Sequence, residues 1–264
     1  MLKITNLTKV FDPGSQNEKL ALTGLSLTLA PGEFATVIGG NGAGKSTMLN
    51  CIAGVFPIDK GTIILDGENI TDWPEHKRSR VIGRVFQNPL MGTAFAMTIE
   101  ENLAMAFTRG KRRGLQRGIK QADRRTFRER LAELELGLED RLTDKVGLLS
   151  GGQRQALTLL MATIVRPQLL MLDEHTAALD PLTSRKVLQL TRDIVEAEQL
   201  TALMVTHNMN EALAFGHRTL MMHEGRIILD LKGEARAKMT VESLIASFKQ
   251  QSGEELANDR LLLS

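Results

Sequence analysis

The most constraining feature of the chain is an eight-residue glycine-rich stretch in its N-terminal part. This stretch, GGNGAGKS at residues 39–46, satisfies the phosphate-loop pattern G-x-x-x-x-G-K-[ST] at every fixed position. A short apolar run at 34–38, typical of a buried parallel strand, precedes it, and residues 47–53 are predicted to form a helix that ends at Gly54. This strand–turn–helix arrangement gathers backbone N–H groups and the positive end of a helix dipole around one anion. It therefore predicts a polyphosphate ligand.

The fixed residues of this loop have separate tasks. We expect Lys45 to reach the β- and γ-phosphates of a nucleotide and the Ser46 hydroxyl to hold Mg²⁺. Glycine is needed where a Cβ would block the phosphates or where φ must be positive. The complete motif argues against a glycine-rich turn that binds nothing. It does not identify the class of protein, because kinases, GTPases, helicases and transport ATPases all share it. The expected nucleotide contacts are Gly39, Gly40, Asn41, Gly42, Ala43, Gly44, Lys45, Ser46 and Thr47.

Composition narrows the class of protein. The chain has 264 residues, of which 42% are hydrophobic and 24% charged, so it can bury a full core as one large domain with a subdomain. Lys and Arg total 33 against 31 acidic residues, and the net charge of +2 gives no general attraction for nucleic acid. The single cysteine, Cys51, cannot form an internal disulfide, which suits a reducing cytosol. We expect no nucleic-acid partner.

No stretch of the sequence looks like a membrane span or a signal peptide. The longest apolar runs fall well short of the ~18 residues that a spanning helix needs. Residues 1–5 alternate like a strand and lack the apolar core of a signal peptide. We therefore expect a soluble chain that works at a membrane only through a partner.

Alternating β and helical patterns predict an α/β fold with a mainly parallel core sheet, an antiparallel β rim and a helical subdomain. Residues 2–10 and 20–29 alternate apolar and polar side chains around a turn-rich link, as antiparallel rim strands do. Further strands are predicted at 62–67, 81–86, 169–174, 202–206, 219–223 and 226–230, the last two as a hairpin.

Helical patterns define the predicted domain organisation. Helix formers dominate from 98 to 138, and further helices are predicted after residue 153, at 183–198 and at 240–248. We expect one nucleotide-binding domain over 1–233, with the helical subdomain inserted at about 90–165, and a C-terminal helical tail over 234–264.

The helical insertion contains a basic run. A solvated loop is the simpler interpretation, and a patch that meets anionic lipid headgroups or an acidic partner loop is the alternative. Its members are Arg109, Lys111, Arg112, Arg113, Arg117, Lys120, Arg124 and Arg125.

Polar side chains follow three of the predicted strands. Gln87 follows 81–86, the pair Asp173 and Glu174 ends 169–174, and His207 follows 202–206. Open α/β sheets bind ligands at the carboxyl ends of their strands, so these residues are well placed beside the phosphate loop. Alternation along a strand sends the two carboxylates different ways, Asp173 toward Mg²⁺ and Glu174 toward the γ-phosphate as a base or water-orienting group.

Two further features point to a nucleotide. Leu149-Ser150-Gly151-Gly152-Gln153 opens a helix with a capping hydroxyl and free N–H groups, which makes a second anion site in the same domain. Phe11 ends the first strand, where its ring either stacks on a nucleotide base or packs as a rim aromatic.

Together these residues identify a family: the sequence resembles the nucleotide-binding subunits of ABC transporters over nearly the whole chain. LSGGQ at 149–153 is that family's signature and is absent from kinases and GTPases. By position, Gly39 to Ser46 resembles Walker A, Gln87 the Q-loop glutamine, 169–173 Walker B and Glu174 the catalytic glutamate. Residues 178–180 resemble the D-loop, so Asp180 is expected at the nucleotide. His207 resembles the switch histidine and Phe11 the adenine-stacking aromatic.

Two positions depart from the family pattern, namely His175 after the glutamate, where proline is common, and Gly40, where proline or serine is common. Neither removes a phosphate or metal ligand. Together with the motif sequences they resemble a bacterial subgroup that serves amino-acid import, especially of tryptophan or tyrosine.

The resemblance implies an ATPase with ATP and Mg²⁺ as its ligands. Lys45, Glu174 and His207 would be the catalytic residues, and Ser46, Gln87 and Asp173 the metal site. Two copies would face head to tail, so that Ser150, Gly151, Gly152 and Gln153 of one close on ATP held by the other. An integral membrane permease and an extracytoplasmic substrate-binding protein would be partners, which places the chain in the cytoplasm on the inner face of the cell membrane.

One alternative function stays open. A soluble ABC-type ATPase without a transport partner would serve iron–sulfur assembly, DNA or ribosomes. The sequence has no long coiled-coil insertion, no second cassette and no cysteine cluster to favour it. A small-molecule kinase is more distant, because it leaves LSGGQ and His207 without a task.

Overall fold

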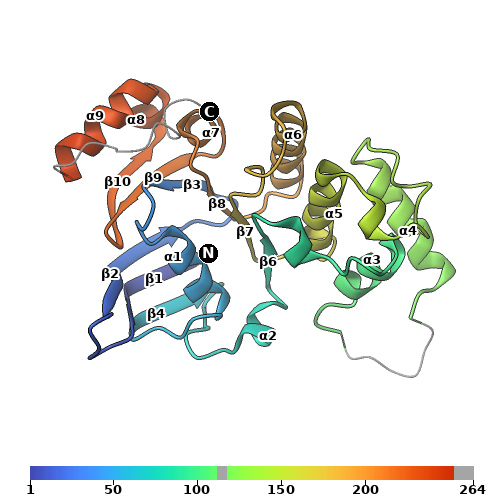
Figure 1. The fold of residues 1–264 in the computed structure, drawn as a ribbon, viewed down its shortest axis with the longest axis horizontal. Helices are drawn as coiled ribbons and strands as arrows, with labels where there is room; N and C mark the ends of the chain where they lie inside the picture. The colour runs from blue at the N-terminus through green and yellow to red at the C-terminus, as the bar shows by residue number, and fades with distance from the viewer. Residues whose placement is uncertain (112–117, 253–264) are drawn as a thin grey trace.

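The computed structural model describes residues 1–111 and 118–252 and contains two sheets (Figure 1). The four-stranded sheet has the order β2-β1-β4-β5 and is antiparallel throughout. The six-stranded sheet has the order β10-β9-β3-β8-β7-β6 and is parallel except for the β9–β10 hairpin. The strands are β1 (Leu2–Phe11), β2 (Lys19–Leu29), β3 (Phe34–Gly39), β4 (Lys60–Leu65), β5 (Glu68–Asn69), β6 (Ile82–Val85), β7 (Leu169–Asp173), β8 (Ala202–Val205), β9 (Arg218–His223) and β10 (Arg226–Lys232). The predicted fold class is confirmed.

The main core lies between the two sheets and surrounds helix α1 (Lys45–Ala53). β1 alternates buried and exposed side chains, because only one of its faces meets this core. β3 is buried at all six positions, as a central parallel strand should be. α1 begins directly at the phosphate loop and ends at Gly54, where Arg78 donates to the carbonyls of Cys51 (2.7 Å) and Ile52 (2.9 Å). A buried cation therefore stabilises the negative end of this helix.

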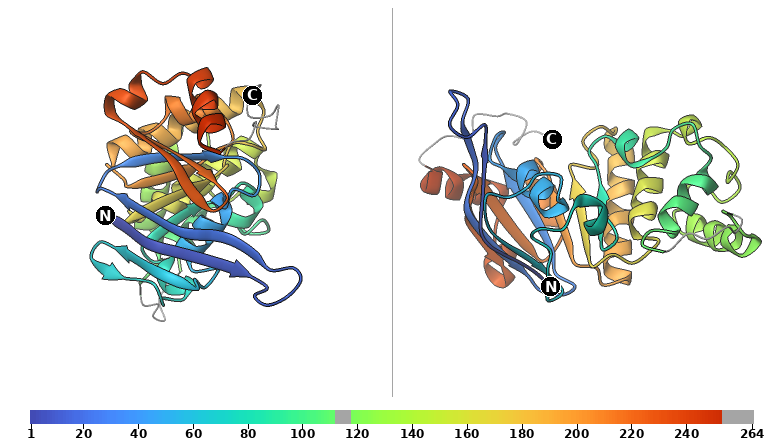
Figure 2. Two further views of the ribbon diagram at one scale, coloured as in Figure 1. Left: turned by 90° about the vertical axis from the view of Figure 1, so that its left-hand side faces the viewer. Right: turned by 90° about the horizontal axis from the view of Figure 1, so that it is seen from below.

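A helical subdomain lies at the far end of the molecule from the antiparallel sheet (Figure 2). It comprises α3 (Ile99–Phe107), α4 (Gln121–Ala132) and α5 (Gly151–Thr163), which share an apolar core around Phe127 and Leu131. The short helices η1 (Pro89–Gly92) and η2 (Val146–Leu148) lead into α3 and α5.

Two arginines of the basic run are not free surface cations. Arg109 donates to the carbonyls of Ala162 (3.1 Å) and Val165 (2.6 Å), and Arg124 pairs with Glu100 at 2.7 Å. The expected members Arg112, Arg113 and Arg117 lie outside the described residues. At least these two arginines of the basic run therefore stabilise the subdomain through contacts within the chain.

Four helices of the C-terminal half pack against the core sheet, namely α6 (Pro181–Ala197), α7 (Met209–Ala214), α8 (Gly233–Ala237) and α9 (Val241–Ser252). The short helix α2 (Glu75–Arg78) instead lies beside the end of α1, through the contacts of Arg78. α9 packs Leu244 and Phe248 against β9, β10 and α7, so the helix predicted at 240–248 is present and docked. Among residues 1–111 and 118–252, no helix has the length and apolar character needed to cross a membrane.

Candidate functional site

Two glycines of the phosphate loop lie where a Cβ would not fit. A Cβ at Gly39 would overlap the Met222 carbonyl oxygen of β9, and one at Gly44, where φ is 96°, would lie 2.8 Å from the Ala21 carbonyl oxygen of β2. The turn of the β9–β10 hairpin also fastens the loop, because the Gly225 N–H donates to the Ala43 carbonyl at 3.0 Å. Strands from both sheets therefore fix the shape of the loop before any ligand binds.

Lys45 lies inside this loop. Its Nζ donates to the carbonyls of Gly39 (2.8 Å) and Gly40 (3.1 Å), and the residue is only 8% exposed. Burial lowers the pKa of Lys45, while the nearby carboxylates of Glu174 and Asp173 act in the opposite direction. Ser46, in contrast, is exposed at the start of α1. An ammonium group held only by carbonyls can exchange them for phosphate oxygens at small cost.

The strand order brings the predicted polar residues together. β6, β7 and β8 are neighbours, and their carboxyl ends deliver Gln87, the pair Asp173 and Glu174, and His207 to one edge. Gln87 Nε2 donates to Glu174 Oε2 at 3.2 Å, and His207 Nδ1 lies 3.6 Å from the same oxygen. Four side chains that the sequence places up to 120 residues apart thus form one cluster beside the phosphate loop.

The charges in this cluster support one another. A hydrogen bond from His207 lowers the pKa of Glu174, and the Glu174 carboxylate in turn raises the pKa of His207. Burial raises the pKa of Asp173, against the opposing influence of Arg84, whose Nη2 lies 3.4 Å from Asp173 Oδ2. Glu174 is therefore ionised at neutral pH, as a base that accepts a proton from water must be.

Glu174 has an unusual backbone, with φ at +44°. Such a conformation is costly for a side chain of this size and needs support from its surroundings. The next residue, His175, supplies support: it is 2% exposed, and its Nε2 lies 3.0 Å from the Thr191 hydroxyl of α6. Thr191 already donates its proton to the Val187 carbonyl (2.8 Å), so His175 Nε2 is the donor. From the sequence, His175 was noted only because proline is common at this position in the ABC family.

The buried imidazole makes the fold acid-sensitive. Burial lowers the pKa of His175 from 6.5 to about 4, so between those values the unfolded chain binds a proton that the folded chain refuses. Stability present above pH 6.5 is lost as the pH falls to about 4, by up to roughly 3 kcal/mol. Urea unfolding across this range should show the loss, and His175→Gln, which keeps a donor but does not titrate, should show a shallower decline. The same decline in both would contradict the assignment, and His76→Gln, on the surface, should behave like the parent chain.

The signature segment, the second anion site predicted from the sequence, lies away from the phosphate loop. Ser150 is the N-cap of α5: its hydroxyl accepts from the Gln153 N–H (3.2 Å) and its own N–H donates to Gln153 Oε1 (3.1 Å). The amides of Gly151 and Gly152 precede the first intrahelical bond and remain for a ligand. Figure 1 shows α5 beyond β6 and β7 from α1, so one chain does not close its signature on its own phosphate loop.

The D-loop residues pack beside the signature. Asp180 is the N-cap of α6, where its Oδ1 accepts from the Thr183 N–H at 3.0 Å. A Cβ at Gly152 would overlap the Thr183 methyl group, and one at Gly151 would lie 3.3 Å from Leu179. A larger residue at 152 would force Thr183 to move, so Gly152 contributes to the packing of α5 on α6 apart from any role at a nucleotide.

Phe11 lies at the rim as predicted, but its ring already has partners. It packs edge to face on Phe56 with ring centroids 5.3 Å apart, and Lys9 Nζ lies 5.4 Å from its centroid. The side chain is half-buried. Stacking on a base through the remaining face stays a prediction.

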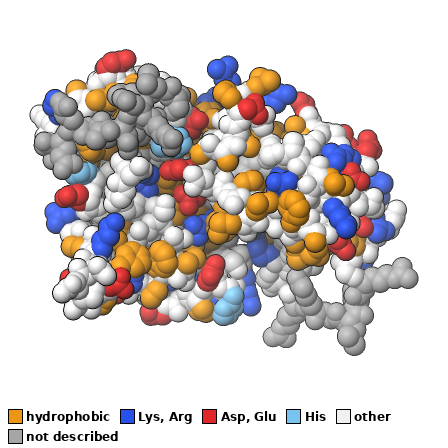
Figure 3. All heavy atoms as spheres, viewed as in Figure 1, with side chains coloured by type: hydrophobic (Ala, Val, Ile, Leu, Met, Phe, Trp, Pro, Cys, Tyr) orange, Lys and Arg blue, Asp and Glu red, His pale blue; other side chains and the backbone are white. Residues whose placement is uncertain are grey.

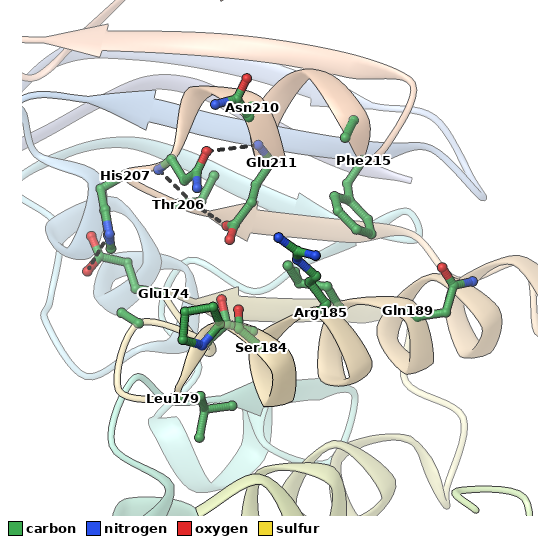
Figure 4. Close-up of a pocket in the computed structure, with 16 residues that line it drawn as sticks. Glu174, Leu179, Ser184, Arg185, Gln189, Thr206, His207, Asn210, Glu211 and Phe215 are labelled. Carbon is green, nitrogen blue, oxygen red and sulfur yellow. Dashed lines mark hydrogen bonds and ion pairs between the residues drawn. The ribbon is translucent and has the colours of Figure 1, made fainter. Parts of the chain in front are cut away.

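A cleft of about 630 Å³ opens next to Glu174 and His207, between α6 and α7 (Figure 4). Arg185 and Gln189 project from α6 and Glu211 and Phe215 from the α7 side. The cleft lies behind the two catalytic candidates and does not include the phosphate loop, so it is not the nucleotide site.

The donor set fits Mg²⁺ held together with nucleotide phosphates. Among the described residues, no group of three His, Cys, Asp or Glu side chains could hold a metal by itself. The Ser46 hydroxyl, the Asp173 carboxylate and the side-chain carbonyl of Gln87 offer oxygen ligands. Mg²⁺ uses ligands of this kind when phosphates and water complete its coordination shell. The ammonium group of Lys45, which donates only to the carbonyls of Gly39 (2.8 Å) and Gly40 (3.1 Å), fits the phosphates themselves.

This fold and site define a P-loop nucleotide hydrolase. The family model "ABC transporter" matches residues 22–177. The tyrosine transport ATP-binding protein of Clostridioides difficile is 43% identical over 249 residues, 94% of this chain and 99% of that protein. An aliphatic sulfonates import ATP-binding protein of Agrobacterium fabrum is 34% identical, over 98% of this chain and 90% of that protein. The chain therefore belongs to the ABC transporter family, as an ATP-binding and ATP-hydrolysing cassette.

Solved structures agree with this assignment. A dimeric ATP-binding cassette in a post-hydrolysis state bound to ADP and Pi superposes with a TM-score of 0.75 at 31% identity, over 88% of this chain and 98% of that one. An ADP-bound cassette of an ABC transporter gives a TM-score of 0.77 at 25% identity, over 96% and 97%.

Two residues of the site were missed from the sequence. Arg84 pairs with Asp173, and Thr191 anchors His175. A signal for Arg84 existed, since an arginine in the middle of an otherwise apolar predicted strand needs a partner. Thr191 offered none, because a threonine within an amphipathic helix is common.

Proposed function

We propose that two copies of this chain form the ATP-driven motor of an importer for an amino acid such as tyrosine, working through a separate membrane permease. The strongest support is the pair of anion sites at the starts of α1 and α5, which lie apart in one chain (Figure 1). A head-to-tail pair gives each phosphate loop the signature of its partner. ATP then closes the pair because its γ-phosphate adds contacts that only the closed state offers.

In this proposal each polar residue has one task. Lys45 and the loop amides bind the phosphates. Ser46, Gln87 and Asp173 would hold Mg²⁺, and the metal would supply positive charge to the phosphates. Glu174 accepts the proton of the attacking water, and His207 steadies Glu174 and contacts the γ-phosphate. The proximity of Gln87 and His207 to Glu174 Oε2 supports this division.

An exposed apolar surface supports docking to a permease. Leu90, Met91 and Phe95 follow the Q-loop and are 48%, 69% and 52% exposed, and Leu148 of η2 is 70% exposed. The Gly147 N–H donates to the Phe95 carbonyl (3.0 Å), which brings these segments side by side. Figure 3 shows hydrophobic side chains gathered over this junction between β6 and the helical subdomain. An exposed apolar patch of this kind is typical of a surface that binds another protein.

Further parts of the proposal rest on the relatives. The transported solute is proposed from the tyrosine transport protein, which is similar over nearly its full length. The chain would sit at the cytoplasmic face of the membrane through the permease, with an extracytoplasmic protein delivering the solute. Transport of radiolabelled tyrosine by the reconstituted complex tests this part.

A complementation experiment tests the composite site. Lys45→Ala disables the phosphate loop, and Gly151→Asp puts a negative charge where the γ-phosphate would meet α5, while an acid at a helix start leaves the fold intact. Each variant alone should be inactive. An equal mixture should recover about a quarter of the parent ATPase rate, because half of the dimers are mixed and each has one complete site.

Two outcomes would speak against the composite site. A mixture no more active than its components would mean that the two sites belong to one chain or to none. A parent rate that rises strictly in proportion to protein concentration would also contradict it, because a dimer requires a steeper rise at low concentration.

A further inference from the structure

Arg84 is a charged residue in a strand that otherwise faces the core. In β6 it pairs with Met171 of β7 in parallel register, and Asp173 lies two residues beyond Met171. Residues two apart on a strand share a face of the sheet, so the register directs Arg84 and Asp173 to the same side. Both side chains are largely enclosed, with 14% and 15% of their surfaces exposed.

The contact between them is a loose ion pair. Arg84 Nη2 lies 3.4 Å from Asp173 Oδ2, against ~2.8 Å for a tight charge-assisted hydrogen bond. Only one oxygen of the carboxylate has this contact, so the other is left for a different ligand. The Nε of Arg84 is buried without a hydrogen-bond partner. The guanidinium is therefore placed for the contact with Asp173 at the expense of its own hydrogen bonding.

Neighbouring groups hold the guanidinium in place. Its centre lies 4.6 Å from the centroid of the Phe86 ring, within the range of a cation–π contact. The backbone carbonyl of Phe86 accepts from Nε2 of Gln155 (3.2 Å), a fully buried residue of α5. The strand, the ring and the signature helix thus fix Arg84 next to the Walker B carboxylate.

We propose that Arg84 is a positioning residue for the Mg²⁺ site: it holds Oδ2 of Asp173 and leaves the other oxygen for the metal that Asp173 and Ser46 would hold. This inference rests on the proposed role of Asp173. Outer groups that orient a ligating carboxylate commonly change metal affinity by about 10- to 100-fold when they are removed. A guanidinium that merely competed with Mg²⁺ for Asp173 would have the opposite effect, because its removal would tighten metal binding.

The test measures metal dependence without turnover. In a Glu174→Gln background, binding of a fluorescent ATP analogue is followed as free Mg²⁺ is raised, and again in EDTA. Arg84→Met keeps the apolar stem, and we expect it to raise the Mg²⁺ concentration for half-maximal binding about tenfold, with binding in EDTA unchanged. Arg84→Lys restores a charge but not the planar stack, so its value should lie between those of Met and Arg.

Controls separate this inference from the proposed function. Asp173→Asn should shift the Mg²⁺ dependence at least as far as Arg84→Met, and Arg128→Met, an exposed arginine of α4, should not shift it. An unshifted Asp173→Asn would overturn the metal site itself. A shifted Asp173→Asn with an unchanged or lowered value for Arg84→Met would overturn only the role of Arg84. If Arg84→Met does not fold, an Arg84→Lys value equal to that of the parent would overturn it.

Discussion

Glu174→Gln should slow ATP hydrolysis by about a thousandfold while ATP binding persists, because an amide cannot accept the proton of the attacking water. The amide is nearly isosteric and can still contact Gln87 and His207, which meet Glu174 Oε2 at 3.2 and 3.6 Å. The closed, ATP-bound dimer should therefore accumulate. Phosphate release measures the rate, and size-exclusion chromatography with ATP measures the dimer.

A matched substitution shows whether this effect belongs to the site. Glu196→Gln removes an exposed carboxylate of α6 and should leave turnover within about twofold of the parent. Near-normal hydrolysis by Glu174→Gln would refute the role of Glu174 as base. Lost hydrolysis together with lost ATP binding would point instead to damage of the phosphate site.

Arg218→Met should destabilise the fold by about 2 kcal/mol, because it removes a buried cation that makes several charge-assisted hydrogen bonds. Arg218 is 5% exposed and binds Asp230 with two hydrogen bonds (2.7 and 2.6 Å), the Thr28 carbonyl (2.6 Å) and Glu33 (3.2 Å). These contacts join β9 to β10, to β2 of the other sheet and to the turn before β3. The midpoint of urea unfolding measures the loss.

Another arginine of the same hairpin serves as the control for Arg218. Arg226 is exposed at the start of β10, and Arg226→Met should change stability by no more than about 0.5 kcal/mol. Equal unfolding midpoints for the two variants would show that the Arg218 network contributes nothing beyond the side chain itself. Because the network supports the strand next to the phosphate loop, weaker ATP binding by Arg218→Met is also expected.

Most helices and strands of the fold could be predicted from local sequence patterns. The alternation in β1 and β2, the apolar run of β3 and the helical period of α6 each reflect which side of one element meets the core, and that is written in neighbouring residues. The phosphate loop could be recognised in the sequence for the same reason, since its glycines, lysine and serine lie within eight consecutive residues.

The gathering of Gln87, Asp173, Glu174 and His207 was also predictable. Each ends or follows a parallel strand of the core sheet, and the carboxyl ends of such strands meet at one edge. The contacts among them were not. Both Gln87 and His207 approach Glu174 Oε2 because β7 lies between β6 and β8. This strand order could not be predicted from the sequence.

The sequence by itself determined that this protein has a P-loop and the signature of an ABC cassette, because both motifs are short and contiguous. Only the tertiary structure decided which charges meet: Arg84 with Asp173, His175 with Thr191, Arg218 with Asp230, and Arg109 with the end of α5 rather than with solvent. The physical reason is that a polar side chain needs a partner once it is buried, and packing of distant segments, not local spacing, determines both its burial and its partner.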